Sequence, residues 1–245
     1  MLWYKAWRET RIVTLGGVAA MAIACGMIVW FEHAMRDNAE VPMSYVAYIW
    51  KSVYNSIGRD IFLFLCVILG GGGLLQERAQ GTAGFTLSLP ASRGQIVFWR
   101  AVMGYAGVVA LALTPAVVLP LASPYRNEIY PVSQALGFSL LWAGCGAVFY
   151  GFTFLLAHVL EGEYTAILAA IPSLMFYGVL QGLPWMERLP MLNIFHVVNG
   201  EDMPYFNEGL HLLTGPLPWL PLGAMLVLAS GFVFAAGRRM RLRDF

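Results

Sequence analysis

Six long stretches of this sequence contain no Asp, Glu, Lys or Arg, and this feature most constrains the fold. A membrane-crossing helix needs about 20 mostly apolar residues in a row, because the hydrocarbon core is about 30 Å thick. Only 12% of the 245 residues are charged and 59% are apolar, so a soluble domain would lack the charged surface it needs. The charge-free stretches are Ile12–Phe31, Ile61–Gln76, Ala101–Tyr125, Ile129–Leu160, Tyr164–Met186 and Gly209–Gly237.

We therefore predict an all-α membrane protein in the lipid bilayer, with six transmembrane helices in a single domain, 1–245. The 15 Lys and Arg nearly balance the 14 Asp and Glu, so no net basic field exists to bind a nucleic acid. The predicted spans are residues 12–31, 54–76, 96–122, 132–158, 164–184 and 213–237.

The first eleven residues have an amphipathic pattern. On a helix, Trp3 and Trp7 fall on one side, whereas Lys5 and Arg8 fall on the other. Tryptophan is enriched at the level of the lipid head groups, and basic residues favour the polar side. We therefore predict an N-terminal interfacial helix over 1–11.

The orientation follows from the distribution of Lys and Arg, which favour cytoplasmic loops. With six spans both termini lie on one side. The terminal segments and the loops of that side hold most of the basic residues, including those of the run Arg238 to Arg243. We expect both termini to be cytoplasmic, in a multi-pass protein of the inner (cytoplasmic) membrane.

The second charge-free stretch is short for a span, but a helical spacing of apolar residues continues outward from it. One long helix is therefore expected from about Met43 to Leu75, with Arg59 and Asp60 at the outer edge of the bilayer. Two interpretations stay open for this pair: the side chains line a cavity, or they extend to the interface. The run Gly70 to Gly73 is either a hinge or a site of close helix packing.

The loop over 77–93 is the longest one expected in the cytoplasm. It begins with charged residues and a Gly-Thr turn, continues with alternate apolar residues and ends at a proline. Ser92 and Gln95 have the spacing of a capping box, which predicts that a new helix starts here. A compact, partly apolar loop between two membrane helices is suited to docking a cytoplasmic partner.

This loop resembles the one after the second span in permeases of ATP-binding-cassette transporters of the second exporter type. The shared pattern is Glu-x-x-x-Gly-Thr followed by Leu-x-Leu-Pro-x-Ser-Arg, and the chain length and topology are also similar. In that family the loop forms a coupling helix that sits in a groove of the ATPase subunit. The resemblance assigns this contact to Glu77, Arg78, Gly81, Thr82, Phe85, Leu87, Leu89, Pro90, Ser92 and Arg93.

The resemblance also implies partners. The chain has no Gly-x-x-x-x-Gly-Lys-Ser/Thr loop, so ATP and Mg²⁺ would be bound by separate ATPase subunits, and this chain would not be an enzyme. A second copy of the chain, or a homologous permease, would complete a dimeric export pathway. The outer loop, 185–212, is a candidate re-entrant segment, with Met191, Leu192 and Phe195 as a candidate exit cap. Its histidines, His196 and His211, match no regular metal-ligand spacing.

Two other classes of function stay open. An ATP-independent carrier or scaffold would fit the composition, although carriers usually have ionisable groups at mid-membrane and repeated halves. An intramembrane hydrolase would need a nucleophile beside a base. Ser139 and His158 lie about 28 Å apart along one predicted helix, too far to act together. No metal site, and no cofactor bound by this chain, is expected.

Overall fold

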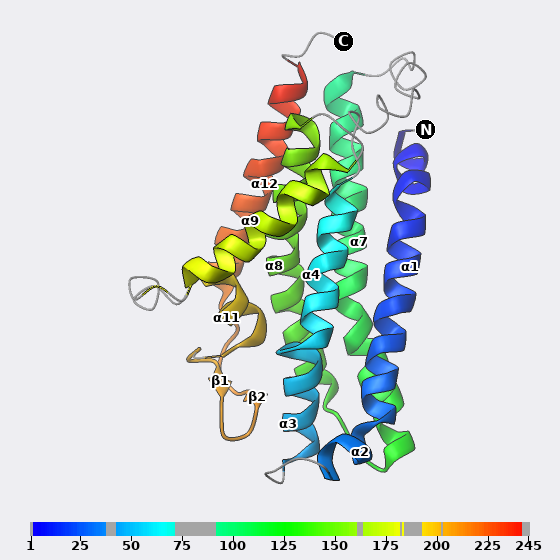
Figure 1. Ribbon diagram of the computed structural model, residues 1–245, viewed down its shortest axis with the longest axis vertical. Coiled ribbons are helices and arrows are strands. Elements are labelled where there is room, and N and C mark those ends of the chain that lie inside the picture. The colour runs from blue at the N-terminus through cyan, green and yellow to red at the C-terminus, as the bar shows by residue number, and fades with distance from the viewer. Residues whose placement is uncertain are drawn as a thin grey trace.

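The computed structural model describes residues 2–37, 43–71, 92–160, 164–181, 183, 193–201 and 203–241. Within these ranges the chain is a helical bundle with one small antiparallel sheet, in which Phe206 pairs with Leu213 (Figure 1). The elements are α1 (Leu2–Trp30), α2 (Glu32–Asp37), α3 (Tyr45–Ile49), η1 (Trp50–Tyr54), α4 (Ile57–Gly70), α7 (Arg93–Ala122), η2 (Ser123–Arg126), α8 (Val132–Val159), α9 (Thr165–Gln181), α11 (Ile194–Asn199), β1 (Phe206–Asn207), β2 (Leu212–Leu213) and α12 (Trp219–Arg241).

Five helical segments of the described chain are long and apolar enough to cross a membrane: α1, α3 to α4, α7, α8 and α12. The prediction of an all-α, multi-pass membrane protein is therefore confirmed in outline. The start of α1 and the end of α12 lie at the same end of the bundle (Figure 1). We call this end the inner end and the opposite end, which holds α2 and the sheet, the outer end.

The sixth predicted span, 164–184, is not confirmed as a full crossing. Helix α9 has 17 residues, which rise only about 25 Å, and it runs obliquely across the bundle (Figure 1). Pro172 lies inside it and removes one backbone hydrogen bond. The last span also begins later than predicted, at Trp219, because Pro216 and Pro218 interrupt the helical pattern and residues 212–213 form β2.

The N-terminal segment does not form a separate interfacial helix. Residues 2–11 continue without a break into the first span as helix α1. No proline interrupts the sequence here, and Glu9 holds the segment against α7 through a 2.8 Å ion pair with Arg100. Glu9 also pairs with Lys5 one turn earlier, at 3.4 Å. Packing against α7 therefore sets the direction of this segment.

The second span extends outward as predicted, but it is bent. Helix α3 starts after the cap Ser44, passes through the π-helical turn η1, and is separated from α4 by Asn55 and Ser56. The bend brings the backbone of Gly58 against the Val53 carbonyl, where any Cβ atom would overlap it. A glycine at 58 is therefore required by this close approach.

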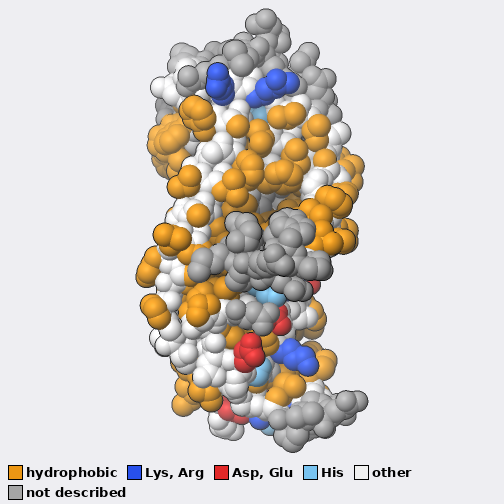
Figure 2. Space-filling view, turned by 90° about the vertical axis from the view of Figure 1, so that its left-hand side faces the viewer, with side chains coloured by type: hydrophobic (Ala, Val, Ile, Leu, Met, Phe, Trp, Pro, Cys, Tyr) orange, Lys and Arg blue, Asp and Glu red, His pale blue; other side chains and the backbone are white. Residues whose placement is uncertain are grey.

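Helix α8 is the centre of the bundle. It packs against α7, α12, α4, α9 and α11, and 72% of its most apolar window is buried, against 28% for α1 and α12. Its outer half carries Phe138, whose ring stacks on Tyr54 of η1, and Trp142, which meets the same tyrosine edge to face. The peripheral helices direct apolar side chains outward, as Figure 2 shows for one face of the molecule.

The small residues of the second span pack closely, as one of the two interpretations predicted. A Cβ atom added at Gly70 would lie 2.6 Å from the Tyr150 carbonyl of α8, and one at Gly71 would overlap Ile167 of α9. Such close contact is typical of helix pairs in membranes, where small residues let backbones approach. Gly72 and Gly73 lie outside the described residues.

Gly70→Ala should destabilise the folded protein by about 1–3 kcal/mol, because the added methyl group meets backbone rather than a movable side chain. Gly26→Ala is the matched control, since nothing lies within 4 Å of the position its Cβ would take. Unfolding in detergent, followed by circular dichroism, measures both. Equal stability of the two variants would contradict the close packing of α4 on α8.

Lys51 and Arg238 test the orientation, because both side chains are exposed at opposite parts of the bundle. Lys51→Cys should react with an impermeant maleimide in intact cells, whereas Arg238→Cys should react only after the membrane is opened. The native cysteines Cys25, Cys66 and Cys145 are buried and should give little background. The reverse pattern would invert the expected topology.

Candidate functional site

Arg59 and Asp60 lie in the first turn of α4 and form an ion pair, with Arg59 Nε donating to Asp60 Oδ1 at 2.9 Å. A terminal nitrogen of Arg59 reaches Asn55 Oδ1 at 3.4 Å. The guanidinium carbon also lies 5.9 Å from the centre of the Phe195 ring, a cation–π arrangement. The structure therefore joins one predicted exit-cap residue to the predicted ion pair.

The pair lies within the candidate membrane span Tyr45–Gly70, just after the bend between η1 and α4. Phe195 packs against Phe149 in the inner half of α8. The carbonyl of the preceding residue, Ile194, accepts a hydrogen bond from the Cys145 thiol at 3.7 Å. Cys145 also contacts Met225, which is six residues, or about 9 Å, inward from the start of α12.

A lateral groove of about 470 Å³ lies between α4 and α9, and Arg59 and Asp60 are part of its wall. Phe149 and Phe195 form its aromatic floor, and Val67 and Ile171 line its apolar part. Phe64 and Met175 are exposed at the rim, so the groove opens on the surface of the bundle. Of the two interpretations of the ion pair, the geometry favours the one in which it lines a cavity.

Gln181, at the end of α9, is a groove residue that sequence reasoning missed. Its amide nitrogen is buried and has no hydrogen-bond partner in the described part of the chain. The sequence signal for this residue was a polar glutamine inside a predicted apolar span. Its place in the same groove as Arg59 follows only from the oblique course of α9. Gln181 therefore adds a polar side chain to the wall of the groove that holds the ion pair.

The segment after α9 folds back towards the middle of the bundle. Asn193 caps α11 by accepting from the His196 backbone at 3.1 Å, and the Ile194 N–H donates to the Tyr177 hydroxyl at 3.2 Å. Val197 and Val198 are fully buried against α8. This geometry supports a re-entrant segment, although Met191 and Leu192 of the candidate cap lie outside the described residues.

Hydrogen bonds fasten the outer segment to the spans. Trp50 of η1 donates to the Asn199 carbonyl at 2.9 Å, and Asn199 in turn donates to Asn55. Gln134 of α8 bonds both backbone groups of Leu213, at 2.9 and 2.7 Å. Any rearrangement of the outer segment is therefore coupled to η1, and through Asn55 to Arg59.

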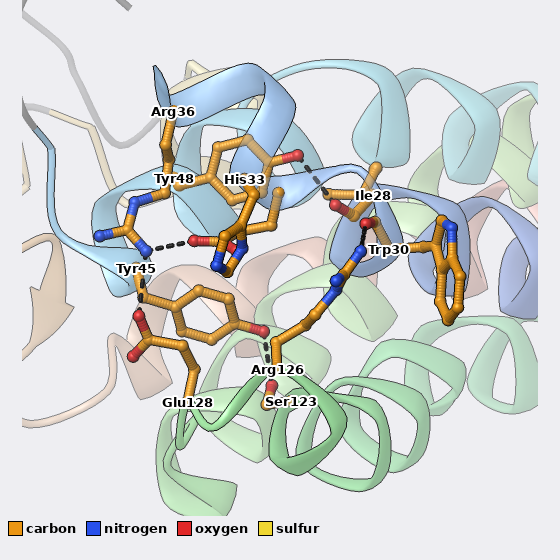
Figure 3. A network of polar contacts seen from close by, with 10 residues as sticks. Ile28, Trp30, His33, Arg36, Tyr45, Tyr48, Ser123, Arg126 and Glu128 are labelled. Carbon is orange, nitrogen blue, oxygen red and sulfur yellow. Dashed lines mark hydrogen bonds and ion pairs between the residues drawn. The ribbon is translucent and has the colours of Figure 1, made fainter. Parts of the chain in front are cut away.

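A network of charged and polar residues closes the outer end between α1, α3 and η2 (Figure 3). Glu32 is 1% exposed and is bonded by both His33 and Arg36. Arg36 also pairs with Glu128 at 3.0 Å, and these hydrogen bonds, Glu32 first, raise the pKa of its guanidinium. The sequence contained one signal for this network, the Glu32–Arg36 spacing of four residues.

Two tyrosines complete the same network. The Tyr45 hydroxyl shares a 2.6 Å hydrogen bond with Ser123, and Tyr48 donates to the Ile28 carbonyl at 2.8 Å. Arg126 donates to the Trp30 carbonyl and stacks over the Trp30 ring. These contacts join the outer ends of three spans and fix the frame in which the groove lies.

The predicted coupling residues 77–90 lie outside the described residues. At the end of that loop, Ser92 and Gln95 form the predicted capping box, so helix α7 begins at Arg93 as expected. Both flanking helices, α4 and α7, have their loop-side ends at the inner end of the bundle (Figure 1). Ser139 and His158, considered for a hydrolase, are both buried on α8, nineteen positions apart.

Glu32→Gln should lower the free energy of unfolding by about 1–3 kcal/mol, because Arg36 and His33 then lose their buried charged partner. Glu128→Gln should cost less than about 1 kcal/mol, since that carboxylate is partly exposed. Thermal unfolding of the purified variants compares the two losses. A larger loss for Glu128→Gln would contradict the central place of Glu32.

Comparison with known proteins identifies no family for this chain. No protein-family model matches the sequence, and no curated protein matches it either. The functional argument therefore starts from the groove, its ion pair and the motif in the loop before α7.

Proposed function

We propose that this chain is the permease subunit of an ATP-driven exporter of the second exporter type. Separate ATPase subunits would bind ATP and Mg²⁺ and dock on the loop from Glu77 to Arg93. Two permease chains, either two copies or this chain and a homologue, would enclose the transport pathway. The observation that carries the proposal is the loop motif, Glu-x-x-x-Gly-Thr followed by Leu-x-Leu-Pro-x-Ser-Arg.

The arrangement of the bundle supports this proposal. The helices on either side of the loop end at the inner end, beside both termini (Figure 1). That end also carries exposed Arg8, Arg238 and Arg239, as the bias of basic residues towards the cytoplasm predicts. An ATPase in the cytoplasm could therefore reach the loop directly.

The packing around α7 offers a route by which loop movement would reach the pathway. Helix α7 starts at the capping box, and two turns later Arg100 pairs with Glu9 of α1. The Arg100 carbonyl also accepts from Tyr150 of α8 at 3.3 Å. A displacement of α7 would act on α1 and α8 together, as alternating access between two packings requires.

One observation favours a second candidate, an ATP-independent carrier. Such proteins use ionisable groups within their spans, and Arg59 and Asp60 lie within the candidate span Tyr45–Gly70. In both candidates the groove between α4 and α9 belongs to the substrate route. The two differ in whether an ATPase subunit is required.

Purification of the tagged chain from its native membrane should bring down an ATPase subunit. Glu77→Arg should lower the recovered ATPase at least about tenfold, because it reverses a charge in the proposed docking loop. Glu208→Arg, a charge reversal in the predicted outer loop, is the matched control and should leave recovery unchanged. Transport that persists without any associated ATPase would favour the carrier.

A further inference from the structure

The groove between α4 and α9 has a polar end and an apolar end. Arg59, Asp60 and Gln181 lie at the polar end, whereas Val67 and Ile171 lie at the other. Val67 follows Arg59 by eight residues of helix, a rise of about 12 Å. A molecule that fills this space needs a polar head and a hydrocarbon chain of several carbons.

The ion pair selects the head group by its charge. Within the described part of the chain, Asp60 Oδ2 and the second terminal nitrogen of Arg59 make no hydrogen bond, and the Asp60 side chain is 64% exposed. An anionic head alone would be repelled by Asp60, and a cationic one alone by Arg59. A head that carries both charges side by side can satisfy both residues.

The hydrogen-bonding groups of the groove narrow the choice of head group further. The carboxylate of Asp60 accepts hydrogen bonds, which a primary ammonium donates and a quaternary ammonium cannot. A phosphate oxygen can accept from the second terminal nitrogen of Arg59, and the Gln181 side chain adds a polar group at the same end of the groove. The head group that fits is therefore a phosphate next to a primary ammonium.

The direction of the groove indicates the leaflet. Along α4, the polar end at Arg59 lies towards the outer end of the bundle and Val67 towards the inner end (Figure 1). A lipid bound there has its head outward and its chain inward. This is the orientation of a lipid in the outer leaflet.

We propose that the groove binds a membrane phospholipid of the phosphatidylethanolamine class, with its phosphate on Arg59, its ammonium on Asp60 and an acyl chain along Val67 and Ile171. The proposal deepens the proposed function, because it names the class of amphiphile that the export pathway would accept or release at the outer leaflet. The binding itself does not depend on an ATPase.

The test measures which lipids the full chain retains. The protein is exchanged into an equal mixture of phosphatidylethanolamine, phosphatidylglycerol and phosphatidylcholine with the same acyl chains, and bound lipid is counted by native mass spectrometry after detergent washing. Phosphatidylethanolamine should be retained about tenfold over the other two, as one additional charged hydrogen bond predicts.

Variants assign the selectivity to the ion pair. Asp60→Asn should remove the preference for phosphatidylethanolamine over phosphatidylglycerol, and Arg59→Gln should reduce retention of both. Gln181→Leu, which leaves the ion pair intact, should lower retention of all phospholipids about threefold. Lys51→Gln is the control, because it removes an exposed cation outside the groove. Folding of each variant is checked by its elution profile.

Equal retention of the three lipids, or a preference that survives Asp60→Asn, would overturn the proposal. If Arg59→Gln does not fold, Asp60→Asn and Gln181→Leu still decide the outcome. Selective retention in a chain that recruits no ATPase would support the lipid site and refute the exporter. Recruitment of an ATPase by a chain that retains all lipids equally would support the exporter and refute the lipid site.

Discussion

The enclosure of α8 by its neighbours is the constraint on which the rest of this structure depends. Water cannot drive helices together inside a bilayer, so close packing must hold them. At Gly70, and at Gly146 of α8, an added methyl group would meet the neighbouring helix within 3 Å. Contacts with α8 position α4, α7, α9 and α12. The width of the groove between α4 and α9 is therefore set by how these two helices pack on α8.

The polar groups of the bundle are arranged around that apolar centre in two layers. In the outer network Glu32, Arg36 and Glu128 are paired with one another, and the contacts of Tyr45, Tyr48 and Arg126 join the ends of three spans. The second layer consists of Arg59 and Asp60, which are only partly hydrogen-bonded and face the groove. A satisfied network stabilises a frame, whereas a pair with free donors and acceptors can bind a ligand.

Helix α11 connects these two layers. Asn199 is bonded to η1, and Phe195 of the same short helix lies against both Arg59 and the core of α8. The outer segment is therefore positioned to respond to what occupies the groove. A substrate route through this protein would pass beside α11 before it reached the outer surface.

Charge-free stretches determined most of the fold, because burial in lipid excludes ionised groups over about 20 residues. The start of α7 was also predictable, since a capping box depends only on Ser92 and Gln95. Three features required the tertiary structure. Packing on α7 sets the direction of the N-terminal segment, α9 runs obliquely across the bundle, and the packing of α9 and α11 beside α4 brings Gln181 and Phe195 to the groove of Arg59. Each depends on contacts between residues far apart in the chain, whereas hydropathy and capping report only the composition of neighbouring residues.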